Sequence, residues 1–303
     1  MKTLLTGANG LVGSTIHAEL RLSNREQLDL RDWDNTYCYF KDFKPDAVIH
    51  TAARVGGLGA NMNHMAEFYH DNILINTNVL EAARRTGVKK VVSFLSTCIF
   101  PAKASLHYPL TESQLHEGEP HSSNFGYAYA KRMLEVHSRA IANQYGLNYI
   151  CVIPTNIYGP HDNFNLEDSH VLPALIHKCY LAKRDNTDLV VWGSGKPLRE
   201  FIFSKDVGEI TQLILEHYEG TDPMIISTSE ETSIREAVKI IADVMGFEGN
   251  IIFDDTKPDG QYKKPTSNLR LKSFLPEYEF TPFSEGVKQT VDWFVENYED
   301  CRK

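Results

Sequence analysis

Short apolar runs alternate with helical patterns along the first half of the chain. The runs that we expect to form strands are Lys2–Thr6, Ala47–His50, Lys90–Leu95 and Asn148–Pro154. Between them, the spacing of apolar residues predicts a helix that begins near Leu11 and further helices over Asn72–Arg85 and Tyr127–Tyr145. Strands that alternate with helices pair in parallel, so the pattern predicts an α/β fold with a doubly wound parallel sheet.

The second half of the chain is less regular. Helices are expected over His170–Ala182, Ser233–Met245 and Phe283–Tyr298, and Gly193–Pro197 reads as a turn-rich loop. We therefore expect a first domain over residues 1–162, to which a segment near 200–222 returns. Residues 163–303 are expected to form mainly a smaller C-terminal α/β domain, with a cleft between the two.

Composition narrows the function classes. The chain has 303 residues and a formal net charge of −9, and an acidic body of this kind repels nucleic acids and anionic membranes. No apolar run is long enough for a membrane helix, and the N-terminus lacks the features of a secretory signal. The cysteines are scattered, which argues against a disulfide scaffold and a zinc cluster. We expect a reduced, cytoplasmic protein without a metal.

A glycine-rich loop follows the first predicted strand. Its residues are Gly7, Ala8, Asn9, Gly10, Leu11, Val12 and Gly13. Glycines let a backbone approach a pyrophosphate closely, and the N–H groups of the loop and the next helix then bind it. A glycine triplet alone is also found in ordinary tight turns. Its place at the start of a βαβ pattern favours a Rossmann-type, dinucleotide-binding domain.

The segment after the second strand bears on which dinucleotide is bound. Arg25 is the first charged residue that it offers, and an arginine there suits the 2′-phosphate of NADP(H). The alternative is an ordinary surface cation. Asp29 is expected to lie beyond reach of the ribose. Only eleven residues separate Gly13 from Arg25, fewer than a full helix and strand need, so the adenosine end of the site is expected to be altered.

A tyrosine and a lysine have the spacing of a reductase proton donor. Tyr127 and Lys131 are four residues apart and share one helix face. An ammonium beside a phenol stabilises the phenolate, and the pair can deliver a proton to a carbonyl that is being reduced. Ser96, at the end of the preceding strand, is placed to hydrogen-bond the same carbonyl oxygen.

The order of glycine loop, serine and Tyr-x-x-x-Lys resembles the short-chain dehydrogenase/reductase superfamily, in its extended form that acts on sugar nucleotides. Within it, the chain is similar over nearly its whole length to the GDP-L-fucose synthases, which are bifunctional epimerase-reductases. The segments that carry this resemblance are Ala52–Gly57, Ser96–Pro101, Pro154–Phe164, Ser169–Pro173, Val191–Gly193 and Lys257–Gln261.

The resemblance implies a reaction and a set of residues. GDP-4-keto-6-deoxy-D-mannose would be inverted at C3 and C5 and then reduced at C4 with NADPH. Cys98 and His170 match the acid/base pair for the inversions, beside Ser96, Tyr127 and Lys131. The implied cofactor contacts are Leu95, Ser96, Lys131, Pro154, Thr155, Asn156, Ile157 and His170, and the implied substrate contacts are Lys178, Trp192, Arg199 and Asp259.

Other readings of these residues stay open. A cysteine is often a small buried hydrophobe, and a histidine at a helix start, such as His170, is often a cap or a surface group. Trp192 could belong to the core, and Arg199 could pair with Glu200 or another acid. A different NADP-dependent sugar-nucleotide reductase or epimerase would share the glycine loop and the Tyr/Lys pair but would not need both Cys98 and His170. A non-catalytic NADP-binding sensor is a further alternative. The superfamily also implies a homodimer, built on helices over Glu67–Arg85 and Tyr127–Tyr145.

Overall fold

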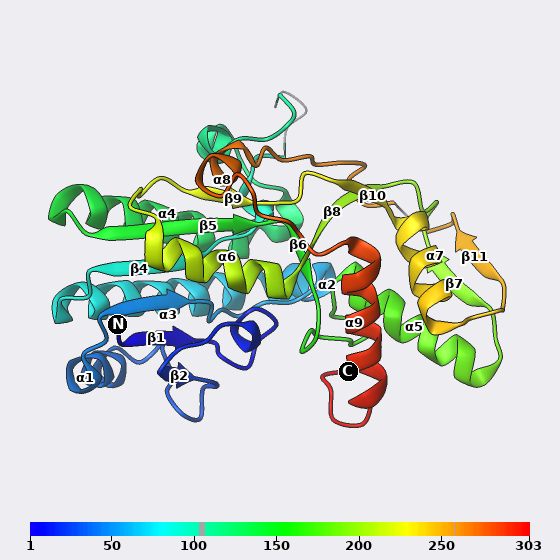
Figure 1. Ribbon diagram of the computed structural model, residues 1–303, viewed down its shortest axis with the longest axis horizontal. Coiled ribbons are helices and arrows are strands. Elements are labelled where there is room, and N and C mark those ends of the chain that lie inside the picture. Colours follow the sequence, from blue (N-terminus) through cyan, green and yellow to red (C-terminus); the bar gives the residue numbers. More distant parts are fainter. Residues whose placement is uncertain (103–106, 258) are drawn as a thin grey trace.

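The computed structural model describes residues 1–102, 107–257 and 259–303, so Pro258 of the Lys257–Gln261 segment lies outside the described residues. A six-stranded parallel sheet forms its larger part, in the order β2-β1-β3-β4-β5-β9 (Figure 1). Its strands are β1 (Thr3–Thr6), β2 (Leu20–Leu22), β3 (Ala47–His50), β4 (Lys90–Phe94), β5 (Asn148–Pro154) and β9 (Met224–Ile226). The predicted doubly wound parallel sheet is therefore confirmed.

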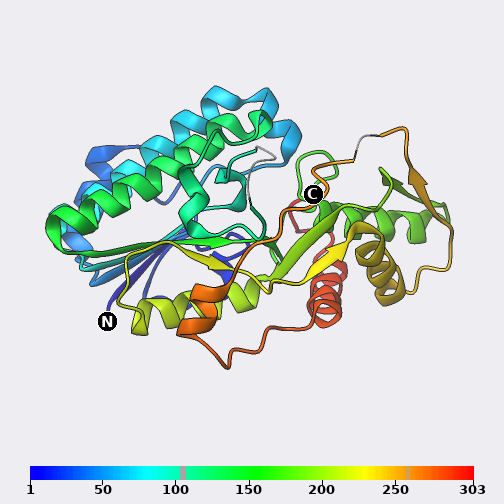
Figure 2. The same cartoon turned by 90° about the horizontal axis from the view of Figure 1, so that it is seen from above.

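Helices cover both faces of this sheet, which explains why its inner strands are apolar throughout. One face carries α1 (Trp33–Phe43), α3 (Met65–Thr86) and α4 (Phe125–Tyr145), and the opposite face carries α6 (Ser204–His217) (Figure 2). The short α2 (Leu58–Asn63) precedes α3, and α8 (Leu269–Phe274) packs beside β9. Sequence analysis did not predict α1, whose aromatic residues are weak helix formers.

A smaller group of elements stands beside the carboxyl ends of the main strands. Its helices are α5 (Val171–Asp185), α7 (Ile234–Met245) and α9 (Phe283–Glu296), close to the predicted ranges. Its strands form a sheet of β6 (Asn156–Tyr158), β8 (Leu198–Phe203) and β10 (Glu231–Ser233), and a pair of β7 (Leu189–Trp192) and β11 (Ile251–Asp254). Apolar faces of the three helices pack on one another around Ile241 and Phe294.

The connection from β1 to β2 differs from the prediction. The expected α-helix near Leu11 is absent from this stretch, which is described throughout, and a single 3-10 turn, η1 (Gly13–Thr15), takes its place. Only the residues from Gly7 to Glu19 join the two strands, and the glycine loop uses the first half of them. Too few residues remain for a helix that could run back along the sheet.

Further 3-10 turns are η2 (Thr97–Ile99), η3 (Glu112–His116) and η4 (Ser122–Asn124). The first of these follows β4 and carries Cys98 at the carboxyl end of the sheet. In the part of the chain that the structure describes, no helix combines the length and the apolar character needed to cross a bilayer.

Candidate active site

The glycine loop turns tightly at the carboxyl end of β1. Gly10 N donates to Gly7 O at 3.0 Å, and a side chain at Gly13 would overlap the same carbonyl oxygen. Thr51 Oγ1, at the end of β3, donates to Thr6 O at 2.6 Å and so ties the loop to the sheet. The N–H groups of Leu11 and Val12 have no acceptor among the described residues. Free N–H groups on a close-packed loop fit a dinucleotide pyrophosphate.

A cleft of about 700 Å³ runs from this loop to the Tyr127 helix. It joins residues that are far apart in sequence, at the carboxyl ends of the parallel strands, where open α/β sheets bind their ligands. The predicted residues that line it are Gly7, Asn9, Gly10, Leu11, Val12, Gly13, Arg25, Leu95, Ser96, Tyr127, Lys131, Pro154, Thr155, Asn156, Ile157 and His170. Ala8 is buried behind the loop, and its N–H donates to Leu22 O at 2.9 Å.

Tyr127 and Lys131 project from the first turns of α4 onto one side of the cleft. Gly126 brings this end of α4 close to α3, because a side chain there would overlap Met65 O. Lys131 is 2% exposed; its Nζ donates to Phe94 O at 2.7 Å and lies 5.8 Å from the Tyr127 ring centroid. Burial lowers the pKa of Lys131 to about 8. Burial, with a smaller contribution from Cys98, raises the pKa of Tyr127, so the phenol is a protonated donor at neutral pH.

Cys98 lies on η2 and follows in sequence the residues Ser96 and Thr97, which line the cleft. Its N–H donates to Ser96 Oγ at 3.4 Å. Burial raises the pKa of its thiol, and hydrogen bonding to Ser96 and the charges of Lys264 and Lys131 act in the opposite direction. Because burial has the larger effect, the thiol is neutral in the free protein. The nearby charges and the Ser96 hydroxyl lower the cost of forming the thiolate.

Three cations surround the turn that carries Cys98, and each is held by a backbone carbonyl. Lys131 Nζ donates to Phe94 O, Lys264 Nζ to Thr97 O and Arg132 Nε to Ile99 O, each at 2.7 Å. None of the three makes an ion pair with an acid among the described residues. We call these residues the cation cluster. Burial lowers the pKa of Lys264 to about 8, so it carries its charge at neutral pH.

Removing the charge of Lys264 is expected to raise the pKa of the Cys98 thiol. In Lys264→Met, the pH profile of Cys98 alkylation by iodoacetamide moves to higher pH, because the thiolate loses an attracting charge. Peptide-resolved mass spectrometry separates Cys98 from the exposed Cys38. Lys264→Arg keeps the charge and should give the wild-type pH profile. Lys263→Met, a change at the exposed neighbouring residue, should also leave the pH profile unchanged. Superimposable profiles for Lys264→Met and the wild type would contradict this role.

His170 enters the cleft from the other group of elements. It is the residue immediately before α5, and its side chain does not cap that helix. The imidazole is open to the cleft but surrounded by protein, and this burial lowers its pKa. At neutral pH it is uncharged and able to accept or return a proton.

Sequence analysis missed Asp162 at the same cleft. Its carboxyl is buried: Oδ1 accepts from Asn163 N at 2.7 Å, and Oδ2 has no partner among the described residues. Burial raises the pKa of Asp162 to about 7. A carboxyl in this state can donate a hydrogen bond to a ligand hydroxyl or amide. The His161–Phe164 motif contains it, but its burial could not be read from the sequence.

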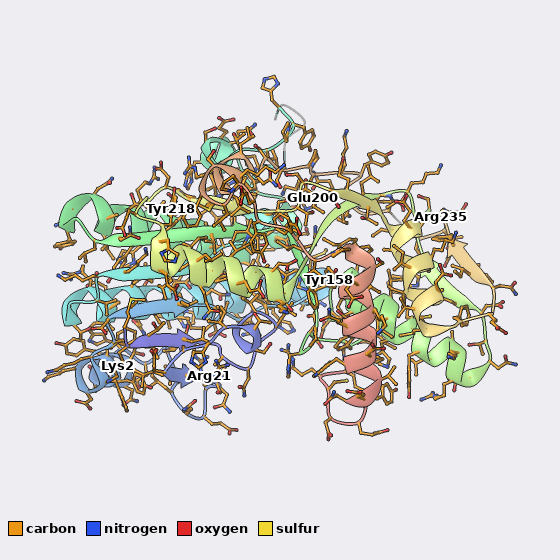
Figure 3. The ribbon with its side chains drawn as sticks, in the orientation of Figure 1. Lys2, Arg21, Tyr158, Glu200, Tyr218 and Arg235 are labelled. Atoms are coloured by element: carbon orange, nitrogen blue, oxygen red, sulfur yellow. The ribbon has the colours of Figure 1, made fainter. Side chains whose placement is uncertain are left out.

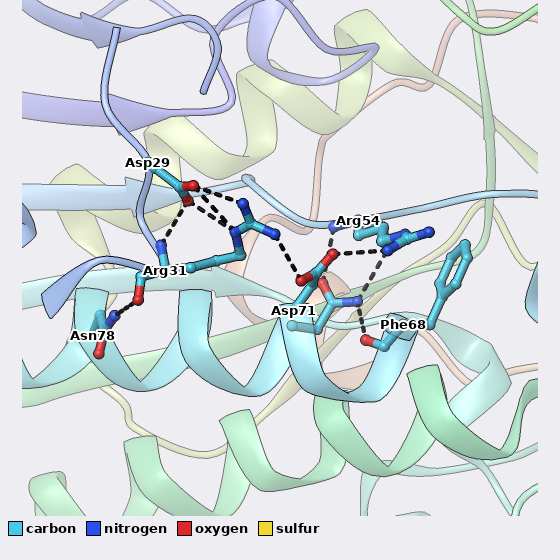
Figure 4. A network of polar contacts seen from close by, with 7 residues as sticks. Asp29, Arg31, Arg54, Phe68, Asp71 and Asn78 are labelled. Atoms are coloured by element: carbon cyan, nitrogen blue, oxygen red, sulfur yellow. Dashed lines mark hydrogen bonds and ion pairs between the residues drawn. The ribbon is translucent and has the colours of Figure 1, made fainter. Parts of the chain in front are cut away.

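Two arginines that were not predicted, Arg31 and Arg54, also line the cleft (Figure 4). Asp71, on α3, accepts from Arg31 Nη1 at 3.0 Å and from Arg54 Nη1 at 2.9 Å. Arg31 also donates to both oxygens of Asp29, from Nε to Oδ1 at 3.0 Å and from Nη2 to Oδ2 at 2.7 Å. Asp29 lines the cleft, and its carboxylate is occupied by Arg31, so its expected distance from the ribose stays a prediction. Arg25 makes no ion pair with an acid of the described residues, although its charge adds to the hydrogen bonds of Arg31 in lowering the pKa of Asp29.

The four predicted substrate contacts form a second group, outside the lining of the main cleft. Lys178 Nζ, on α5, lies 4.5 Å from the ring centroid of Trp192 on β7. Asp259 accepts from Ser194 N and Ser194 Oγ at 2.8 and 2.7 Å. Arg199 Nη1 donates to Gln261 O at 2.8 Å, which attaches the segment after Asp259 to β8.

Two alternatives for this group are excluded by the geometry. Trp192 is 63% exposed and so does not belong to the core. Glu200 does not pair with Arg199: its carboxylate accepts from Ser227 Oγ at 2.9 Å and from Thr266 N at 2.9 Å. Arg199 lies within the electrostatic reach of Asp259 and makes no ion pair with Glu200. Two cations face the exposed indole ring of Trp192: Lys178 Nζ at 4.5 Å and Lys257 Nζ at 5.6 Å from its centroid. Cations and an aromatic ring of this kind suit a nucleotide diphosphate and its base.

Comparison with known proteins gives a consistent family. The model of the NAD dependent epimerase/dehydratase family matches residues 3–227. The GDP-L-fucose synthase of Dictyostelium discoideum is 48% identical over 99% of this chain and 97% of its own length. That of Escherichia coli is 36% identical over 99% and 98%. A GDP-L-fucose synthetase from Naegleria fowleri, solved bound to NADP, superposes with a TM-score of 0.93 at 44% identity, over 99% of this chain and 94% of its own. The chain belongs to the NAD dependent epimerase/dehydratase family and, within it, to the GDP-L-fucose synthases.

Proposed function

We propose that the protein makes GDP-L-fucose from GDP-4-keto-6-deoxy-D-mannose, by inversion at C3 and C5 and NADPH-dependent reduction at C4. The observation that carries this proposal is the meeting of Ser96, Tyr127, Lys131 and His170 in one cleft with the glycine loop. Cys98 stands on the adjoining turn, and a group suited to a nucleotide diphosphate lies nearby. A simple sugar-nucleotide reductase has no use for both Cys98 and His170.

In the reduction, the residues of the cleft hold the ketone and protonate it. When bound, NADPH supplies the hydride to C4 of the sugar. Tyr127 gives its phenolic proton to the C4 oxygen, which Ser96 Oγ also contacts. Lys131 stabilises the phenolate that remains, and its low pKa lets it exchange that proton with solvent. Among the described residues, Thr155 Oγ1 and the free N–H groups of the loop have no hydrogen-bond partner, and a bound dinucleotide can provide one.

In each inversion, a C–H bond next to the C4 ketone breaks and its proton passes to a base. The electron pair moves onto the ketone oxygen as an enolate, and a new C–H bond forms on the opposite face of the sugar. We assign Cys98 as the base and His170 as the acid. The cation cluster favours the thiolate form of Cys98, and the two residues come from different groups of elements.

We assign the diphosphate of the substrate to Lys178 and Arg199, and its base to Trp192. Asp259 holds the loop between Trp192 and Arg199 through its hydrogen bonds with Ser194. Residues 1–162, with a segment near 200–222, would then serve the dinucleotide, and residues 163–303 mainly the substrate. We also place the protein in the cytoplasm, where its free cysteines stay reduced.

Product identification tests the proposed function. The full chain is incubated with GDP-4-keto-6-deoxy-D-mannose and NADPH, and the sugar nucleotide formed is analysed by NMR. GDP-L-fucose is the expected product. A 6-deoxy sugar of the D series would show a reductase without epimerase activity, and cofactor binding without any turnover would point to a non-catalytic sensor.

The choice between NADPH and NADH is expected to depend on Arg25. Arg25→Gln should weaken NADPH binding by about ten- to a hundred-fold, because a charge-assisted contact to the 2′-phosphate contributes roughly 1.5–3 kcal/mol. NADH, which lacks that phosphate, should bind nearly unchanged in titrations. Glu26→Gln, at the exposed neighbour, is the control. Equal losses for the two cofactors would mean that Arg25 does not read the 2′-phosphate.

We further propose a homodimer in which α3 and α4 pack against their symmetry mates. These two helices lie side by side and expose large apolar side chains: Met65, Tyr69, Phe125, Met133 and Val136. Light scattering should give twice the chain mass of 34.4 kDa. Met133→Asp together with Val136→Asp should shift the protein toward monomer, whereas Val190→Asp, on the exposed side of β7, should not. A monomeric wild type at micromolar concentration would overturn this assembly.

A further inference from the structure

The glycine loop of this protein lacks the helix that a dinucleotide-binding fold ordinarily places behind it. Such a helix supplies free N–H groups and a partial positive charge of about half a unit at its N-terminus, which attract the pyrophosphate. Here the chain passes through the 3-10 turn η1 and reaches β2 directly, all within described residues. A single short turn has almost no dipole of its own.

The guanidinium of Arg21 occupies the space behind the loop. Arg21 lies on β2, at the edge of the main sheet, where it pairs with Leu5 of β1 (Figure 3). Its Nη2 donates to Ala8 O and Gly13 O, both at 3.1 Å, and its Nη1 donates to Ile16 O. In an α-helix, main-chain N–H groups of later residues would bind carbonyls of this kind.

The charge of Arg21 is not neutralised. It makes no ion pair with a described acid, and its side chain is half-buried. The carbonyls that it holds flank the loop, whose Gly7, Gly10 and Gly13 line the cleft while Arg21 does not. Arg21 therefore acts through the loop and not by contact with a ligand in the cleft.

Other contacts hold the end of the loop against α6 and the core, so the loop has little freedom to compensate for a shift at Arg21. Thr15 Oγ1 donates to Ser204 O at 3.2 Å at the start of α6, and Ile16 is 2% exposed. On the side of β2, Arg21 holds three main-chain carbonyls of this stretch, those of Ala8, Gly13 and Ile16. The planar fork of an arginine spreads five N–H donors over three nitrogens and so reaches carbonyls that lie apart, whereas a lysine donates from a single nitrogen.

We propose that Arg21 replaces the missing helix: it is a positioning residue that shapes the glycine loop for the dinucleotide pyrophosphate and adds the positive charge that the helix would have supplied. This inference rests on the dinucleotide binding of the proposed function. It separates the roles of two arginines, since Arg21 serves the pyrophosphate common to NADPH and NADH, and Arg25 serves the 2′-phosphate of NADPH alone.

The test compares Arg21→Met, Arg21→Lys and Arg25→Gln in the full chain. Dissociation constants are measured for NADPH, NADH and adenosine 2′-monophosphate, which has no pyrophosphate. Arg21→Met should weaken NADPH and NADH equally, by about ten-fold, and leave the 2′-monophosphate unchanged. Arg25→Gln should weaken NADPH and the 2′-monophosphate and leave NADH nearly unchanged. Arg21→Lys, which keeps the charge, should recover a large part of the affinity for both cofactors.

Thermal unfolding of the ligand-free variants separates this role from a merely structural one. If Arg21→Met lowers the melting temperature but the folded protein binds both cofactors like the wild type, the inference is overturned. If Arg21→Met fails to fold, Arg21→Lys decides. A small loss of affinity that is equal for NADPH and NADH supports the inference, and a loss confined to NADPH, or no loss for either cofactor, overturns it. Failure of the wild type to bind either cofactor would instead refute the proposed function.

Discussion

Cys98→Ser is expected to separate epimerisation from reduction. The substitution keeps the size of the side chain but replaces a thiol by a hydroxyl that is far less acidic, so proton removal from C3 and C5 should stop. Hydride delivery with Ser96, Tyr127 and Lys131 should persist, and the variant should slowly reduce the unepimerised ketone to a 6-deoxy sugar of the D series. In heavy water, without reduced cofactor, the wild type should exchange deuterium into C3 and C5, and the variant should not.

Two controls accompany this experiment. Cys38→Ser removes an exposed thiol on α1, remote from the cleft, and should exchange deuterium like the wild type. His170→Gln should also block inversion, and it should do so without changing the alkylation of Cys98. If the Cys98→Ser variant exchanges deuterium at the wild-type rate and still yields GDP-L-fucose, Cys98 is not the base and serves only in packing.

Loss of the Tyr127 hydroxyl is expected to cost the enzyme its reduction step. Tyr127→Phe keeps the ring, which packs edge-on at 6.5 Å from Phe68, and removes only the proton donor. Turnover should fall by about 10²–10⁴-fold, the usual contribution of general acid catalysis, while the dissociation constant of NADPH stays near that of the wild type. Since burial raises the pKa of Tyr127, wild-type reduction should not lose this donor at mildly alkaline pH.

Tyr129→Phe is the matched control for this substitution. Tyr129 lies on the same helix but outside the lining of the cleft, where its ring contacts the Arg132 guanidinium at 5.5 Å. Its variant should turn over like the wild type. If Tyr127→Phe keeps more than a tenth of the wild-type turnover rate, Tyr127 is not the proton donor of the reduction.

Local patterns predicted the parts of the site that are themselves local. The glycine loop, Ser96 and the Tyr127–Lys131 pair each fall within a few residues at a strand end or on one helix turn, and the cleft brings them together. Strand alternation likewise predicted the parallel sheet, because strands that are buried on both faces form continuous apolar runs. The expected helix near Leu11 was wrong because the spacing of apolar residues takes no account of the length of chain available between two strands.

Residues that act through distant contacts could not be found this way. Lys264 reaches Thr97 across 167 positions of sequence, and nothing near Lys264 distinguishes it from the exposed Lys263. Arg31 and Arg54 share Asp71 only because α3 passes beside both. Asp162 is unusual for its burial and not for its neighbours in sequence. The signal for all of these residues is three-dimensional.

The cation cluster has a consequence for how this site tolerates sequence change. Its acceptors are the main-chain oxygens of Phe94, Thr97 and Ile99, which every amino acid provides. Substitutions at those three positions can alter packing but cannot delete the groups that hold the cations. The Asp71 network is the opposite case, since one change of Asp71 to Ala would remove the acid that Arg31 and Arg54 share and leave Arg31 with Asp29 alone. Genetic drift can therefore disrupt the Asp71 network in one step, whereas the charge around Cys98 is lost only by mutation of the cations themselves.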